Sequence, residues 1–243
     1  MIDLPVGKGA KALGELSEQA KETRGRILKA AEDLFSEKGI DGTSVSQIAD
    51  KAGVTKPLIY YYFKNKRGVL DSLTGSLLDE VERFTLAWVE ENYHLISAGK
   101  LQIDQNKLKL TAMTQEEIDR FFEDSFSTPI QATVDFFLSR RKTLHIMAIE
   151  SLKKGPNSSL VLQIVDLLNE GLLPTSLEQK GVHFSKEALV HKFFLEVMPV
   201  LSFALYCDQW SERYGMAHEE LKATFIQGFK EVKRARTISL NDG

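Results

Sequence analysis

The chain has 243 residues, of which 43% are hydrophobic and 27% charged, as in an ordinary globular protein with enough apolar side chains for one large or two smaller domains. The single cysteine, Cys207, excludes an intrachain disulfide and fits a reducing compartment. No secretory signal is visible, and the longest apolar run, residues 197–207, is too short for a bilayer. We therefore expect a cytoplasmic protein without a membrane partner.

The charges are unevenly distributed along the chain. The net charge is −3, which at first argues against nucleic-acid binding. Residues 20–70, however, hold ten basic and six acidic side chains, a net charge of +4, which leaves −7 for the other residues. A basic segment joined to an acidic one is typical of a DNA-binding domain followed by a second domain.

The N-terminal residues 1–20 carry glycines and scattered charges without periodicity, which predicts a mobile arm. A tail without contacts and an arm that touches the DNA backbone or minor groove are both compatible with this composition. A helix is expected from Arg24 to Lys38, with Thr23 as its cap and Gly39 ending it. Its apolar stripe consists of Ile27, Ala31, Leu34 and Phe35.

Residues 44–63 predict a helix-turn-helix. Ser44 and Gln47 form a capping box at the start of a short helix, and Gly53 follows this helix where its end favours a positive φ. Thr55 is expected to cap the second helix, and Pro57 falls in the first turn, where a missing N–H does no harm. The second helix has the length and polar start of a recognition helix.

The motif Gly39-x-x-x-Thr43-Ser44-Val45-x-x-Ile48-Ala49-x-x-Ala52-Gly53-Val54-Thr55-Lys56-x-x-x-Tyr60-x-x-Phe63-x-x-Lys66 resembles the DNA-binding domain of the TetR family of transcriptional regulators. The resemblance covers residues 21–70 and includes the preceding helix. Pro57 replaces the more usual glycine, and Leu58 stands where many members carry threonine. The resemblance implies a three-helix DNA-binding domain over residues 21–68, called the head below, and a larger helical effector-binding and dimerisation domain over residues 69–236, called the body. Residues 237–243 are a tail.

The body is predicted to be helical, so the fold class is all-α. No strand pattern stands out. Residues 97–113 are expected to be a loop, with a short amphipathic helix over 105–110 as the alternative, and residues 171–184 to be a second loop. Pro199 is expected to kink a long apolar helix. The predicted body helices span residues 68–91, 115–127, 129–139, 142–154, 158–170, 185–210 and 217–236.

Polar side chains at the starts of the two short helices are the candidates for DNA contact. Ser44 and Ser46 would meet phosphates at a helix N-terminus. Lys56 would reach a guanine edge and Leu58 a thymine methyl. The tyrosine hydroxyls would reach phosphates, with Tyr60 shared between core and phosphate. By the resemblance, the DNA-binding set is Thr43, Ser44, Ser46, Thr55, Lys56, Leu58, Tyr60, Tyr61, Tyr62 and Lys66.

Catalytic and metal-binding patterns are missing from the sequence. None of the five histidines lies in a His-Glu-x-x-His or Cys/His cluster, and a lone cysteine cannot build a zinc site. There is no Gly-x-Ser-x-Gly, P-loop or Gly-x-Gly-x-x-Gly motif. We therefore expect a protein that is not an enzyme and uses neither a metal nor another cofactor.

Adjacent aromatic pairs in the body predict a second apolar surface. Neighbours such as Phe121-Phe122 and Phe136-Phe137 cannot both face one core on a helix. Ordinary core packing, a ligand cavity and a dimer contact are the alternatives for these rings. The residues predicted to line a pocket for an apolar or aromatic effector are Trp88, Phe122, Phe126, Phe137, Met147 and Phe194.

The last two helices carry more apolar residues than one stripe requires. The resemblance implies that they pair with their symmetry mates in a homodimer, which would read a palindromic operator in double-stranded DNA with two recognition helices. The predicted interface residues are Phe193, Val197, Leu201, Leu205, Leu221, Phe225 and Phe229. The sequence thus predicts a repressor released from its operator by a small molecule. The alternatives are a ligand-insensitive DNA-binding or scaffolding dimer and, less favoured, an enzyme with a helix-turn-helix appendage.

Overall fold

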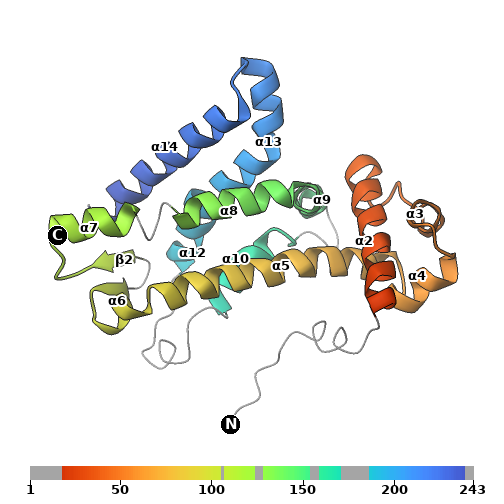
Figure 1. Ribbon diagram of the computed structural model, residues 1–243, viewed down its shortest axis with the longest axis horizontal. Coiled ribbons are helices and arrows are strands. Elements are labelled where there is room, and N and C mark those ends of the chain that lie inside the picture. The colour runs from red at the N-terminus through yellow and green to blue at the C-terminus, as the bar shows by residue number, and fades with distance from the viewer. Residues whose placement is uncertain (1–17, 105–106, 124–127, 154–158, 171–185, 239–243) are drawn as a thin grey trace, which may run out of the picture.

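The computed structural model describes residues 18–104, 107–123, 128–153, 159–170 and 186–238. One long helix, α5, connects the head at one end of the molecule with the helices of the body (Figure 1). The predicted all-α architecture is confirmed, with one small hairpin added. The elements are α2 (Glu18–Lys38), α3 (Val45–Ala52), α4 (Lys56–Phe63), α5 (Lys66–Glu91), α6 (Tyr93–Ser97), β1 (Leu101–Asp104), β2 (Lys107–Leu110), α7 (Gln115–Phe121), α8 (Thr128–Ser139), α9 (Arg141–Leu152), α10 (Leu162–Glu170), α12 (Lys186–Lys192), the π-helical turn η2 (Phe193–Val197), α13 (Met198–Tyr214) and α14 (His218–Ile238).

The helix-turn-helix forms as its local sequence predicts. The Ser44 hydroxyl accepts a hydrogen bond from the Gln47 N–H, and the Gln47 side chain accepts one from the Ser44 N–H at 2.8 Å. Gly53 ends α3 with a φ of 65°, in the left-handed region. The predicted cap at Thr55 is wrong in its chemistry, since this extended residue precedes α4 without a side-chain hydrogen bond to the helix.

Helix α2 is longer than expected. It begins at Glu18, six residues before the predicted start at Arg24, so Thr23 lies inside the helix and does not cap it. The Glu18 carboxylate in the first turn interacts favourably with the positive end of the helix dipole, and it also pairs with Lys21. The predicted mobile arm therefore ends before Glu18, and residues 1–17 lie outside the described residues, as does the tail beyond residue 238.

Head and body share one apolar core. Buried side chains of α2, α3 and α4 belong to the same cluster as buried side chains of α5, α8, α9, α13 and α14. Helix α5 makes the connection, because Val69 and Leu70 lie at its head end and Leu77 and Val81 further along, all of them buried. The predicted long helix is confirmed, and it begins two residues earlier, at Lys66.

An antiparallel hairpin replaces the loop or short helix expected within residues 97–113. Leu101 pairs with Leu110 and Ile103 with Leu108. Both Leu101 and Leu110 are buried with Phe121 and Phe122 of the α7 segment in a second, smaller cluster. The expectation of a helix over 105–110 is wrong for residues 107–110, which form strand β2, and the extended backbone brings Leu101 and Leu110 to the same side as α7.

In place of the kink predicted at Pro199, the helix has one wider, π-helical turn shortly before the proline. Proline has no N–H to donate to the carbonyl one turn back, and the helix passes through η2 immediately before it. The N–H of Met198 donates to the carbonyl of Phe193, five residues earlier. Beyond this turn, α13 and α14 form an antiparallel pair that projects from the rest of the body (Figure 1).

Polar contacts also connect the head to the body. Lys142 of α9 donates to Asp33 of α2 at 2.6 Å, and the buried Thr143 hydroxyl donates to Glu32 at 2.6 Å. Lys153 pairs with Asp41 at 3.1 Å. The hydrogen bond from Lys142 lowers the pKa of the Asp33 carboxyl, and the same contact raises the pKa of Lys142. These groups hold the acidic side of α2 against α9.

Candidate nucleic-acid interface

The start of α4 presents the side chains expected of a recognition helix. Thr55 and Lys56 are exposed, and Leu58 is half-buried. Ile59 and Phe63, further along the helix, are buried in the head core and fix its orientation. Lys56 is the only charged residue of α4, so its positive charge is not opposed within the helix. The helix can therefore present a cation and a hydroxyl to a groove without moving its core side.

The tyrosines of α4 divide by exposure. Tyr61 is 76% exposed and Tyr60 44% exposed, whereas Tyr62 packs against the head core. Tyr61 and Tyr62 meet edge to face, with ring centroids 5.2 Å apart, which restrains both rings. Tyr60 is thus both partly packed and partly accessible. Tyr61 is the tyrosine best placed to offer its hydroxyl to a phosphate.

The start of α3 offers a second polar surface. Ser44 and Ser46 are both exposed, and α3 carries no acidic side chain in its first turn. The Ser44 hydroxyl is occupied in the capping box, so its contribution to binding would come with the exposed backbone of the helix start. Ser46 keeps its hydroxyl at the surface.

Two side chains of the predicted DNA-binding set, Thr43 and Lys66, are bound within the head. Thr43 is buried, and its hydroxyl lies within hydrogen-bonding distance of the carbonyls of Leu34 and Gly39. The Lys66 ammonium donates to the carbonyls of Ile40 and Thr43 at 2.6 and 2.8 Å. Both side chains stabilise the turn between α2 and α3, where backbone carbonyls would otherwise lack partners.

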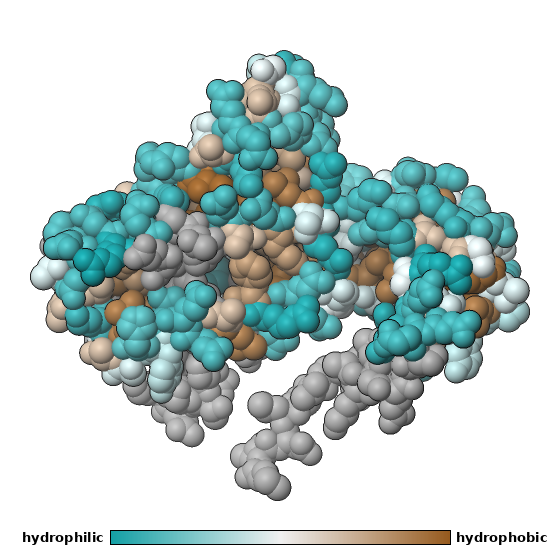
Figure 2. Space-filling view, viewed as in Figure 1, coloured by the Kyte–Doolittle hydropathy of each residue, from teal (hydrophilic) through white to brown (hydrophobic). Residues whose placement is uncertain are grey.

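The head separates its charges between two sides. Glu32, Asp33 and Asp41 contact α9 of the body, as described above. Asp33 also pairs with Lys51 of α3 at 3.6 Å and with Lys29 at 3.9 Å. Half of the six acidic side chains of the head are thus turned towards the body. The helix-turn-helix, residues 44–63, carries two lysines and one aspartate, and the head is mainly hydrophilic on the face seen in Figure 2.

Two head residues were missed from the sequence. Arg26 of α2 is exposed and reaches the turn of the helix-turn-helix, since a Cβ added at Gly53 would lie 3.8 Å from its guanidinium. Gly68 is required sterically, because a Cβ there would lie 2.0 Å from the carbonyl oxygen of Phe63. The grouping of Arg24, Arg26 and Lys29 close together in α2 was a signal for Arg26, whereas nothing local distinguishes Gly68 from any helical glycine.

The predicted effector residues do not converge. Phe137 and Met147 are buried in the main core, Phe122 is buried in the hairpin cluster, and Phe194 is 61% exposed. Phe137 and Met147 thus lie in one core, Phe122 in another and Phe194 at the surface, so these four side chains do not line one cavity within the chain. Phe126 and the side chain of Trp88 lie outside the described residues.

The predicted dimer residues face inwards. Leu201 and Leu221 are buried within the chain, and assigning them to an interface is wrong. Phe225 stacks on Phe203 at 4.4 Å between ring centroids, and the other four predicted residues are half-buried against the main core. The opposite side of α13 is the exposed one, with Tyr206 62% and Trp210 49% accessible. Whether α13 and α14 form a dimer interface stays a prediction, and the exposed residues of α13 differ from those predicted for it.

A Ser–His–Asp contact joins α13 to α14. His218 Nε2 lies 2.9 Å from Asp208 Oδ1, and His218 Nδ1 lies 3.4 Å from Ser211 Oγ. The serine hydroxyl, however, donates to the Met216 carbonyl at 2.7 Å. A nucleophilic serine would direct its proton to the histidine. The arrangement therefore closes the turn around Gly215 and gives no support to catalysis.

Comparison with known proteins assigns the head to a family. Residues 27–73 match the family model of the bacterial regulatory proteins, tetR family. The chain is 32% identical over 73 residues to the tetracycline repressor protein class A from transposon 1721 of Escherichia coli, covering 30% of this chain and 34% of the relative. It is 43% identical over 60 residues to the HTH-type transcriptional regulator TtgR of Pseudomonas putida, covering 25% and 29%. The chain thus matches about a third of the length of these relatives.

The likeness of the fold extends over the body. A transcriptional regulator from Aquifex aeolicus VF5 superposes with a TM-score of 0.50 at 16% identity, over 86% of this chain and 99% of that one. The fatty acid degradation regulator FadR from Bacillus halodurans gives a TM-score of 0.50 at 16% identity, over 86% and 96%. At these identities the comparison concerns the fold alone. The head thus matches the DNA-binding domain of the tetR family over residues 27–73, and the body shares the fold of these solved structures.

Proposed function

We propose that this protein is a cytoplasmic transcriptional regulator, a repressor, that binds a palindromic operator through α4. The observation that carries the proposal is the arrangement of charges in the head. Lys56, Thr55 and Tyr61 are exposed at the helix-turn-helix, while Asp33 and Glu32 are turned towards α9. A cationic helix start beside hydroxyl groups suits both phosphate contacts and base edges in a major groove.

The proposed regulator acts as a homodimer through the exposed side of α13. The helical stretch Leu189–Tyr214 is long and apolar enough by composition to cross a membrane, yet only 17% of its most apolar window is buried. The stretch contains Glu196, which pairs with Lys233 of α14 at 2.7 Å, so this side of it is turned to α14. Leu195, Tyr206 and Trp210 follow one side of it at helical spacing, which a second copy would cover.

We further propose that a small apolar or aromatic effector releases the protein from its operator. Such a molecule would favour a dimer whose heads no longer match two successive major grooves. The alternative, a DNA-binding or scaffolding dimer that responds to no ligand, is favoured by one observation. Of the predicted effector residues whose side chains are described, two lie in the main core, one in the hairpin cluster and one at the surface, so together they do not line a cavity for the effector.

The test is DNA binding by the full-length protein to the intergenic DNA beside its own gene. Saturable binding that weakens steeply with salt is expected, and Lys56→Ala should reduce affinity by about 5- to 150-fold, the range of one base-reading contact. Lys186→Ala, on the exposed start of α12, is the matched control and should bind like the wild type. Equal affinity for unrelated DNA, or equal loss in both variants, would contradict the proposal.

A further inference from the structure

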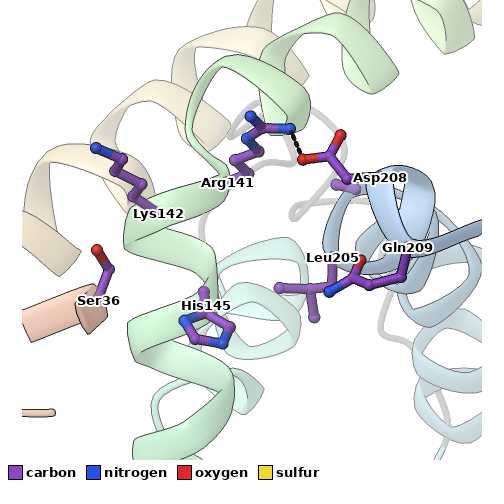
Figure 3. A pocket seen from close by; sticks show the side chains of 8 residues that line it. Ser36, Arg141, Lys142, His145, Leu205, Asp208 and Gln209 are labelled. Atoms are coloured by element: carbon purple, nitrogen blue, oxygen red, sulfur yellow. Dashed lines mark hydrogen bonds and ion pairs between the residues drawn. The ribbon is translucent and has the colours of Figure 1, made fainter. Parts of the chain in front are cut away.

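A surface pocket of about 240 Å³ lies where the head meets the body. Its walls come from α2 (Ser36), α9 (Arg141, Lys142 and His145) and α13 (Ala204, Leu205, Asp208 and Gln209). Figure 3 shows Arg141 and Asp208 joined at one edge, with His145, Leu205 and Gln209 at the other and Ser36 with Lys142 across from them. None of the predicted effector residues lines this pocket, so it is a different site from the one expected within the body.

The lining offers N–H donors to an anion. It holds two cations, Arg141 and Lys142, of which Arg141 pairs with Asp208 of the lining and Lys142 with Asp33 beside it. Both oxygens of the Asp208 carboxylate are occupied, Oδ2 by Arg141 at 2.5 Å and Oδ1 by His218 at 2.9 Å. The hydrogen bond from His218 is the main cause that lowers the pKa of Asp208, which keeps the carboxylate ionised. A guanidinium has five N–H donors and an ammonium three, and each pair described here uses one of them.

The volume of the pocket and its apolar walls further limit the class of ligand that it can bind. A volume of about 240 Å³ is below the ~300–1,000 Å³ of drug-sized sites, so a small metabolite fits best. Ala204 and Leu205 give the pocket an apolar wall beside its cations. We propose that this pocket binds a small organic carboxylate, whose anionic group contacts Arg141 and Lys142 and whose apolar part packs on Leu205.

The occupant would act on the head through Lys142. This lysine holds Asp33 of α2 at 2.6 Å, and Asp33 in turn pairs with Lys51 of α3 at 3.6 Å. A carboxylate in the pocket competes with Asp33 for the Lys142 ammonium and so loosens α2 from α9. The Lys142–Asp33 pair is half-exposed at the lysine, and pairs of this kind are worth little, so the effect on the head is modest, at most about fivefold.

Calorimetric titration of the full-length protein without DNA tests the site at constant ionic strength. Benzoate is the probe, benzamide its neutral isostere, and inorganic phosphate the bare anion. Benzoate should bind with a Kd on the order of 1–10 mM, as its size allows, and at least tenfold more tightly than either benzamide or phosphate. Arg141→Gln and Lys142→Gln should each weaken benzoate about tenfold. Arg120→Gln, which removes the exposed Arg120–Glu116 pair on α7, should leave binding unchanged.

Several results would overturn the site. These are no saturable benzoate binding, equal binding of benzoate and benzamide, phosphate binding as tight as benzoate, or loss of affinity in Arg120→Gln as well. The comparison of benzoate with benzamide uses only the wild type, so it remains valid even where a variant folds poorly.

Hydrogen exchange of the wild type tests the coupling between the pocket and the head, and we expect faster exchange in α3 when benzoate is added. Changes confined to α9 and α13 would refute it. Neither measurement depends on the operator, so the failure of this site and the failure of the proposed regulator function are distinguishable.

Discussion

Gly68 is the residue where the backbone leaves least freedom. The chain turns from α4 into α5 so tightly that a Cβ at this position would lie 2.0 Å from the Phe63 carbonyl oxygen. Backbone atoms cannot yield as a flexible side chain can. The turn therefore depends on glycine although Gly68 has an ordinary negative φ and lies inside α5.

Gly68→Ala is expected to destabilise the protein by more than about 2 kcal/mol, since the clash must shift the backbone between α4 and α5. Gly75→Ala is the matched control on the same helix, because a Cβ there meets nothing within 4 Å. That substitution should be neutral or stabilise by up to about 1 kcal/mol through helix propensity. Urea denaturation followed by circular dichroism measures both, and equal effects of the two substitutions would contradict the steric argument.

Lys66 and Lys56 should separate structure from DNA contact. Lys66→Met removes the donor to the carbonyls of Ile40 and Thr43 and should cost about 1–3 kcal/mol of stability. Lys56→Ala removes an exposed side chain and should leave the thermal midpoint unchanged while weakening DNA binding. Thermal denaturation of both variants decides this assignment, and an unchanged midpoint in Lys66→Met would return Lys66 to the phosphate contacts.

Helical elements were predictable where their signals are local. The capping box of Ser44 and Gln47, the turn at Gly53 and the apolar side of α3 all lie within ten residues and act together. The hairpin over residues 101–110 also carried a signal, the alternation of Leu101 and Ile103 with polar neighbours, but a four-residue strand is easily taken for a loop. The direction in which Thr43, Lys66 and Leu201 point depends on contacts with distant segments, and motif spacing contains no such information.

The element formed by the hairpin and α7 has a carboxyl that titrates unusually low. The Lys100 ammonium donates to Glu117 at 2.7 Å and, with the Thr114 N–H, lowers the pKa of Glu117 to about 2. A lowered pKa means that the contact stabilises the fold above the ordinary value of 4.5 and loses this effect as the pH falls towards 2.

Lys100→Met is therefore expected to raise the pKa of Glu117 towards 4.5, with the Thr114 cap holding it somewhat below that value. Carboxyl carbon chemical shifts recorded across a pH series report the midpoint directly. Arg120→Met, which removes a cation from Glu116 on the same helix, is the control and should leave Glu117 unchanged. A wild-type midpoint near 4.5 would show that the Lys100 contact does not persist in solution.

At the scale of the whole molecule, the exposed side of α13 sets the expected assembly. Tyr206→Asp and Trp210→Asp place charges in the proposed interface and should convert a dimer to a monomer, since desolvating an unpaired charge is unfavourable. Leu152→Asp is the control, because Leu152 is 89% exposed on α9, away from α13. Sedimentation equilibrium measures the mass. Dissociation by Leu152→Asp alone would move the interface to α9.

Because head and body share one uninterrupted core, the head is not expected to behave as an independent module. Regulators are often regarded as exchangeable heads on separate sensing bodies, yet here Ile27 of α2 and Leu144 of α9 belong to one buried cluster, with Thr143 and Lys142 bonded to the same head helix. A fragment cut after α4 would leave this surface uncovered and should fail to fold on its own. A hybrid that grafts a foreign head onto this body would need side chains on α2 that match α9, so we expect that exchanging the helix-turn-helix domain alone would not give a stable protein.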